Sequence, residues 1–338
     1  MPSRSHRLVA FATSAVLLAG CVSTRASRIG ADDGMDACRP QLVALDSTGD
    51  FFAEDILKGA AFGAVTGAVL GAAIGGDVRG ALIGAAAGAA TGAAGGYLYA
   101  LQQRSADQAA LNASLASDLE RENAQLDRTQ VAFNQLMDCR FNRAQQIRQA
   151  YREGRLPKDV AAAQMAELRA RTQHDIALAR QINERIGTRG AEFDTAIESV
   201  APGVKSRVIA AKSGAPPVAA RARTPVVVML RPEPGAPEVG RVAPRQTVQL
   251  RPAAPGYALV EADGQPVGYA ETSAFSTAGG RGGGAPVRLA AATPTPVAAS
   301  SGDVRSLAAS NIARREGFAD SVRTAESATA GGGFELAT

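Results

Sequence analysis

Cysteine and histidine are the residue types whose chemistry in this sequence is easiest to assess. The 338 residues include three cysteines, Cys21, Cys38 and Cys139, and two histidines, of which only His174 lies beyond the N-terminal targeting region. A single histidine cannot complete a catalytic triad, and it gives a zinc site little support. The glycine-rich stretches lack the Lys-Ser/Thr pair and the preceding strand of a phosphate loop. The sequence therefore predicts a protein that is not an enzyme and has no cofactor or metal.

Cys21 follows a stretch with the pattern of a bacterial secretion signal. Arg4 and Arg7 supply positive charge, residues 8–18 are apolar, and the tetrapeptide LAGC ends at Cys21. This tetrapeptide resembles the bacterial lipoprotein lipobox, which implies removal of residues 1–20 and acylation of Cys21, so that membrane lipid holds the chain. Val22 implies, by the sorting rule of that class, the outer membrane with the bulk of the chain in the periplasm. The alternative is an ordinary signal peptide cut at a small residue.

Once Cys21 is set aside for acylation, two cysteines remain, Cys38 and Cys139. An even number favours one disulfide in an oxidising periplasm. The bridge would connect the segment before the glycine-rich stretch to the middle of a later helix. Two unpaired thiols are the alternative. Residues 21–50, which contain Cys38, are predicted to form a mostly irregular tether.

Glycine recurs at every fourth residue in two runs separated by a short polar break. Helix interiors normally avoid glycine, so these runs indicate faces along which another backbone approaches closely. Each arm has about 20 residues, or about 30 Å of helix, close to the thickness of a hydrocarbon core. We predict a membrane-associated helical hairpin over residues 51–101 that makes the protein a homo-oligomer; a soluble hairpin or a low-complexity segment is the alternative. The predicted packing residues are Gly59, Gly63, Gly67, Gly71, Gly75, Gly80, Gly84, Gly88, Gly92 and Gly96.

Residues 102–200 carry two long amphipathic patterns. Apolar residues recur at spacings of three and four, and Gly154 and Pro157 mark a turn between them. We expect an αα-hairpin or coiled coil that acts as a spacer more than as a ligand-binding bundle. Residues 201–223 are rich in Pro, Ala and basic side chains and are predicted to be a linker.

Residues 224–275 contain five short β-prone runs separated by Pro/Gly turns, a spacing typical of a small barrel. The segments LRPEP, VGRV, GYALV and DGQPVGYA resemble the bacterial SH3-like family in order and spacing, with tyrosine at both family tryptophan positions. The resemblance implies a β-barrel that binds peptidoglycan peptides or a partner protein of the envelope. The candidate ligand-binding residues are Arg231, Glu233, Tyr257 and Tyr269; alternatively, both tyrosines pack the core.

Residues 276–338 are predicted to be a low-complexity, disordered tail with a short helix at 303–323. The predicted fold is therefore multi-module: an all-α N-terminal part with the glycine hairpin and the αα-hairpin, then a small all-β SH3-like barrel and the tail. The net charge of +4 gives no case for nucleic acid.

The lipobox and the glycine runs together resemble the glycine-zipper lipoproteins and surface antigens of Gram-negative bacteria, which implies a role in envelope integrity. The alternative function is an accessory of a wall hydrolase or an export machine that binds peptidoglycan or a partner, with the hairpin only as anchor.

Overall fold

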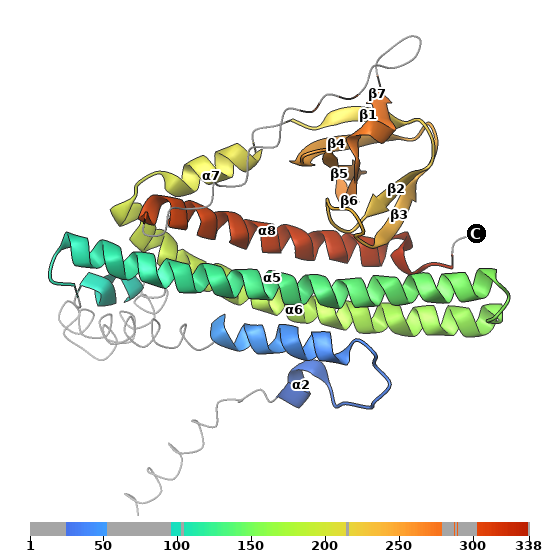
Figure 1. Ribbon diagram of the computed structural model, residues 1–338, viewed down its shortest axis with the longest axis horizontal. Helices are drawn as coiled ribbons and strands as arrows, with labels where there is room; N and C mark the ends of the chain where they lie inside the picture. Colours follow the sequence, from blue (N-terminus) through green and yellow to red (C-terminus); the bar gives the residue numbers. More distant parts are fainter. Residues whose placement is uncertain are drawn as a thin grey trace, which may run out of the picture.

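Long helices form the body of the part of the chain that the structure describes (Figure 1). The computed structural model describes residues 25–52, 96–102, 105–213, 216–278, 287, 289 and 303–336. Helices α5 (Gln108–Arg152) and α6 (Lys158–Val200) form the antiparallel pair expected from the sequence, and α8 (Val304–Ala330) packs against both. The prediction of an all-α part with long helices is confirmed.

Local signals explain where these helices begin and end. The Asp107 carboxylate accepts a hydrogen bond of 2.8 Å from the Ala110 amide and caps α5. Gly154 adopts φ +70° in the turn after α5, a conformation that glycine takes at little cost. Pro157 lies immediately before α6. Proline lacks a backbone N–H, and an N–H at this position would have no partner within the helix. The apolar stripes predicted from the sequence are buried, among them Leu115, Leu119, Leu126, Phe133, Leu136, Met165, Ile182, Ile186 and Phe193.

The short helix expected at residues 303–323 is confirmed as the first part of α8, whereas the prediction of a disordered tail is wrong for residues 324–336. Helix α8 continues beyond the short helix expected there, and its apolar stripe is buried against α5 and α6. The Phe318 ring lies 5.7 Å from the Phe133 ring between centroids, in an edge-on contact. An isolated helix of this composition is marginal in water, so the partner helices supply most of its stability.

Two further segments differ from the sequence prediction. Part of the expected linker forms helix α7 (Val204–Ser213) and strand β1 (Val218–Ala222). Strand β1 pairs with β4 (Thr247–Ala254) and β7 (Phe275–Thr277). The expected tether contains helix α2 (Arg25–Ile29) and a helix over residues 39–52, drawn in blue beside the bundle. Composition did not reveal these elements because their partners are distant in sequence.

Seven strands form one antiparallel sheet in the order β3-β2-β6-β5-β4-β1-β7. This confirms the all-β module. The outer strands β3 and β7 each pair with one neighbour among the described residues, so the sheet is open there and closure into an SH3-like barrel is not confirmed. The remaining strands and the 3-10 turn are β2 (Val226–Met229), β3 (Glu238–Val242), β4 (Thr247–Ala254), β5 (Tyr257–Ala262), β6 (Gln265–Glu271), η1 (Thr272–Ala274) and β7 (Phe275–Thr277).

The sheet has its own core and also lies on α8. Alternate residues such as Ala258 and Val260 of β5 are fully buried, whereas Leu259 between them is half-buried on the opposite face. Strand β6, which pairs with β5, is the strand with the most extensive contact to α8. A short 3-10 turn, η2 (Gly332–Phe334), follows α8 and packs the Phe334 ring 4.9 Å from that of Phe141.

Cys21 and the packing glycines from Gly59 to Gly92 lie outside the described residues. Gly96 is described and is buried at the start of the helical residues 96–102. Across the described parts of the chain, no helix has both the length and the apolar content needed to cross a bilayer.

Candidate functional site: the base of the glycine hairpin

The two ends of the predicted glycine hairpin are both fixed on the helical bundle. Phe52, the last described residue at its N-terminal end, is fully buried, and Leu101 at the other end is 2% exposed. The Tyr97 ring lies 4.8 Å from the Phe193 ring between centroids, and its hydroxyl donates a hydrogen bond of 2.7 Å to Asp118. Aromatic side chains thus attach both ends to the same folded body.

Arg189 of α6 connects these two attachments. Its guanidinium lies 4.8 Å from the centroid of the Phe51 ring and 5.6 Å from that of Phe193. The same guanidinium forms an ion pair of 2.7 Å with the buried Glu122 of α5. We call Phe51, Phe52, Tyr97, Arg189 and Phe193 the zipper base.

The sequence places Phe51, Phe52 and Tyr97 together at the open end of the predicted hairpin, but it does not connect them with residues of α6. Phe193 belongs to the apolar pattern of the second predicted helix, and Arg189 lies one turn before it on the same helix face. A charged residue within an apolar helix stripe is a usable clue, because a buried charge needs a partner. The zipper base therefore holds the two ends of the predicted glycine hairpin next to each other on the bundle.

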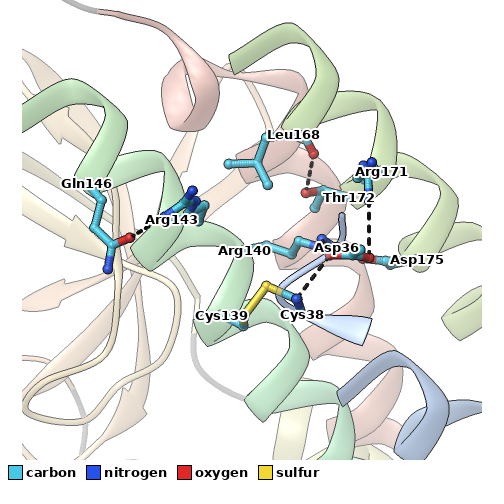
Figure 2. Close-up of a disulfide and its surroundings, with 10 residues drawn as sticks. All are labelled: Asp36, Cys38, Cys139, Arg140, Arg143, Gln146, Leu168, Arg171, Thr172 and Asp175. Carbon is cyan, nitrogen blue, oxygen red and sulfur yellow. Dashed lines mark hydrogen bonds and ion pairs between the residues drawn. A yellow bond between two sulfur atoms is a disulfide. The ribbon is translucent and has the colours of Figure 1, made fainter. Parts of the chain in front are cut away.

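The residue pair Cys38 and Cys139 forms a disulfide, with the Cα atoms 5.8 Å apart (Figure 2). It connects the segment just before the helix of residues 39–52 to the middle of α5. Because that helix leads directly into the glycine hairpin, the bridge also fixes the hairpin's N-terminal end to the bundle.

A buried ion cluster lies beside the disulfide (Figure 2). The Arg140 guanidinium donates to Asp175 at 2.7 Å and to both carboxylate oxygens of Asp36 at 2.6 and 2.8 Å. Burial alone would raise the pKa of Asp36, but hydrogen bonds from Arg140 and the Cys38 amide hold that pKa below its ordinary value. Burial dominates at Asp175 and raises its pKa, despite the same arginine.

The four ligand-binding candidates of the sheet do not form one open groove. Arg231 makes an ion pair with Asp138 of α5, with Nη2 3.0 Å from Oδ2, and another of 2.7 Å with the exposed Glu233. Tyr269 lies against α8, where burial raises the pKa of its hydroxyl despite a hydrogen bond with Thr324.

Tyr257 lies at the start of β5, opposite Glu271 of β6 and away from Arg231. Arg231 and Tyr269 therefore contact the helical part of the same chain. Among the described residues, no group of His, Cys, Asp and Glu side chains is placed to hold a metal ion.

Residues 42–100 match the family model of the YMGG-like Gly-zipper. The chain carries a glycine zipper. The match begins inside the helix of residues 39–52 and ends at residue 100. It therefore includes Phe51, Phe52 and Tyr97 of the zipper base. No curated protein and no solved structure matches the chain.

Proposed function

We propose that this protein is a non-enzymatic lipoprotein of the outer membrane that self-associates through its glycine zipper and supports envelope integrity. The glycine-zipper match carries the proposal, because stripes without side chains allow close contact between helices in a membrane. The lipobox-like sequence at Cys21 supports acylation, and two or more acyl chains make a stable anchor.

The disulfide and the zipper base support the periplasmic part of the proposal. Disulfides persist in oxidising compartments, and the bridge between Cys38 and Cys139 suits the periplasm. In this proposal the zipper base attaches the membrane segment to the helical bundle and so holds the bundle close to the membrane. The bundle then displays the sheet, proposed to be an SH3-like module, toward the wall or a partner protein.

Self-association is tested by chemical crosslinking of the intact protein in envelopes. We expect Gly67→Leu with Gly88→Leu to abolish the crosslinked oligomer, because leucine side chains separate the helices. Ala73→Leu with Ala86→Leu is the matched control, since these positions lie two residues from the glycine stripe and so on another helix face. An oligomer that survives the glycine substitutions would contradict the proposed packing.

The lipid anchor is tested by metabolic labelling with a fatty acid. We expect the label on the wild-type protein and none on Cys21→Ala, which should leave the membrane fraction in part. An unlabelled wild-type protein that washes freely from membranes would overturn the proposed location.

A second function, an accessory that binds the wall or a partner, is favoured by a cleft of about 630 Å³ between the sheet and helices α7 and α8. The zipper would then serve only as an anchor. The two functions are separated by measuring how much protein is retained on purified sacculi. The measurement compares the wild-type protein with the Gly67→Leu/Gly88→Leu protein, which is expected not to self-associate. Undiminished retention would favour the accessory role, and lost retention would favour the assembly.

A further inference from the structure

Arg148, near the C-terminal end of α5, holds the segment that follows α8. Its Nη1 atom donates hydrogen bonds to the carbonyl oxygens of Gly333, at 2.9 Å, and Glu335, at 3.4 Å. Figure 1 shows this segment beside the turn between α5 and α6. About 30 residues of α5, or about 45 Å, separate Arg148 from Asp118, which bonds to the zipper base. Arg148 therefore lies at the end of the bundle that is remote from the zipper base.

The Arg148 guanidinium is half-buried and has no carboxylate partner. In the part of the chain that the structure describes, it forms no ion pair, and its Nε and Nη2 atoms donate no hydrogen bond. Two carbonyl groups carry only partial negative charge, so they do not neutralise a guanidinium. The edge formed by Nε and Nη2 is the edge to which one oxyanion can bind through two parallel hydrogen bonds.

Arginines from both long helices lie beside Arg148. Arg152 is one helical turn further along α5 on the same face, is exposed, and forms no ion pair with a described residue. Arg169 of α6 has its Nη2 atom 4.0 Å from the exposed Glu335 carboxylate, a distance at which an exposed pair contributes little. The Nε atom of Arg169 is buried and has no hydrogen-bond partner among the described residues. Neither guanidinium is therefore neutralised by a close carboxylate.

Arg241 of β3 adds a fourth guanidinium from the sheet. It pairs with Glu238 of the same strand at 2.6 Å. Burial is the largest effect on the pKa of Arg148 and lowers it. Glu238 raises that pKa, whereas Arg152 and Arg241 lower it, so these three residues all lie close to Arg148. We call Arg148, Arg152, Arg169 and Arg241 the arginine group.

The balance of charge selects the ligand class. The arginine group faces two carboxylates, Glu238 and Glu335, which leaves a surplus of two positive charges. A phosphate monoester carries roughly 1.5 to 2 negative charges at neutral pH and has three oxygens that accept hydrogen bonds, so it matches the surplus. A carboxylate carries one charge and two oxygens, and it can occupy only one guanidinium edge. A cation would be repelled, and an apolar ligand would remove the charges from water.

We propose that the arginine group is a binding site for a phosphate monoester, with Arg148 as the bidentate donor and the other three arginines supplying positive charge. The inference goes beyond the proposed function, since it depends neither on acylation of Cys21 nor on the glycine zipper. The bound phosphate and the segment after α8 share Arg148, so the ligand would also order the guanidinium that fixes this segment to α5.

The test is isothermal titration of the full mature protein in detergent with inorganic phosphate, compared with acetate at the same ionic strength. We expect saturable binding of phosphate and none of acetate. Arg148→Gln and Arg152→Gln should each weaken phosphate binding about tenfold, the loss of one charge-assisted contact. Arg148→Lys keeps the charge but not the planar donor edge, and it should also weaken binding. Arg128→Gln is the matched control, because Arg128 is another exposed arginine of α5, about 30 Å from Arg148.

The source of the phosphate group is identified by two further ligands. Glycerol 3-phosphate represents a free monoester, and phosphatidic acid mixed into the detergent micelles represents a lipid headgroup. A lipid source predicts that phosphatidic acid binds more tightly and that Arg148→Gln removes this advantage. A free monoester as the source predicts equal binding of the two, and both outcomes support the site.

Absent phosphate binding, equal binding of acetate, or unchanged affinity in both Arg148→Gln and Arg152→Gln would overturn the inference. Circular dichroism of each variant must show wild-type helix content. Arg152 is exposed, so Arg152→Gln keeps the test valid if Arg148→Gln unfolds.

Crosslinking and fatty-acid labelling of the same preparations separate failure of this site from failure of the proposed function. A protein that is acylated and oligomeric yet binds no phosphate contradicts the site alone. An unacylated monomer that binds phosphate contradicts the proposed function alone.

Discussion

Removing Arg140 is expected to be the most destabilising single change in the ion cluster beside the disulfide. Its side chain is 2% exposed and is bonded to two carboxylates, Asp175 at 1% and Asp36 at 10% exposure. Arg140→Met keeps the approximate length of the side chain but leaves both carboxylates buried without their cation. Breaking a buried pair from one side costs about 3–5 kcal/mol, and we expect a loss in this range.

Asp175→Asn should cost much less than Arg140→Met. Arg140 keeps its two hydrogen bonds to Asp36 in this variant, and the cost of burying the Asp175 charge disappears. One charge-assisted hydrogen bond is worth about 1.5–3 kcal/mol, from which the relief of desolvation is subtracted. The double variant should cost less than the sum of the two single changes, because the substitutions share a partner.

The two carboxylates should respond to pH in opposite directions. The pKa of Asp36 is lowered, so its contribution to stability is present above about 3.8 and is lost as the pH falls through its native pKa. The pKa of Asp175 is raised, so its contribution is greatest at low pH and falls as the pH rises from 3.8 through its native pKa. The penalty of Asp36→Asn should therefore shrink on acidification, and that of Asp175→Asn should shrink on raising the pH.

Urea unfolding followed by circular dichroism, at several pH values and with the disulfide intact, measures these differences. The reasoning is refuted if Arg140→Met costs no more than Asp175→Asn. It is equally refuted if the two asparagine variants show the same pH trend.

Three other perturbations have expected outcomes in the same unfolding assay. Replacing both bridging cysteines by alanine should cost up to about 4.7 kcal/mol, the chain-entropy value for a loop of about 100 residues, given the sequence separation of 101; no loss would mean that the bridge constrains little. Gly268→Ala should cost about 2–5 kcal/mol, because φ is +143° and the new Cβ would lie 2.7 Å from the Met229 carbonyl oxygen, whereas Gly240→Ala has nothing within 4 Å and should cost much less. Gly333→Ala should destabilise the protein by about 1–3 kcal/mol, since its Cβ would meet backbone at 2.5 Å, while Gly332→Ala, with open space, should stay near wild type; equal effects at the two positions would contradict the packing of η2.

The sequence alone determined the elements whose signal is local and periodic. The four-residue glycine repeat identified the glycine zipper, and the apolar stripes identified α5 and α6, because the helical period fixes which side chains share a face. The alternating runs between Pro/Gly turns located most of the strands of the sheet for the same reason. Cys38 and Cys139 were paired by counting, and the structure places them together.

The tertiary structure decided everything that depends on a partner far along the chain. The C-terminal segment became α8 because α5 and α6 provide an apolar surface for it, and the expected linker gained β1 because β4 and β7 lie beside it. Arg140 interrupts the apolar pattern of its helix and Arg189 led to no prediction, yet each is buried beside a carboxylate from another element. Tyr269 was predicted either to bind a ligand or to pack the core of the sheet, and in the structure it lies between the sheet and α8. Burial and charge pairing between distant segments are properties of the folded chain, so no local pattern encodes them.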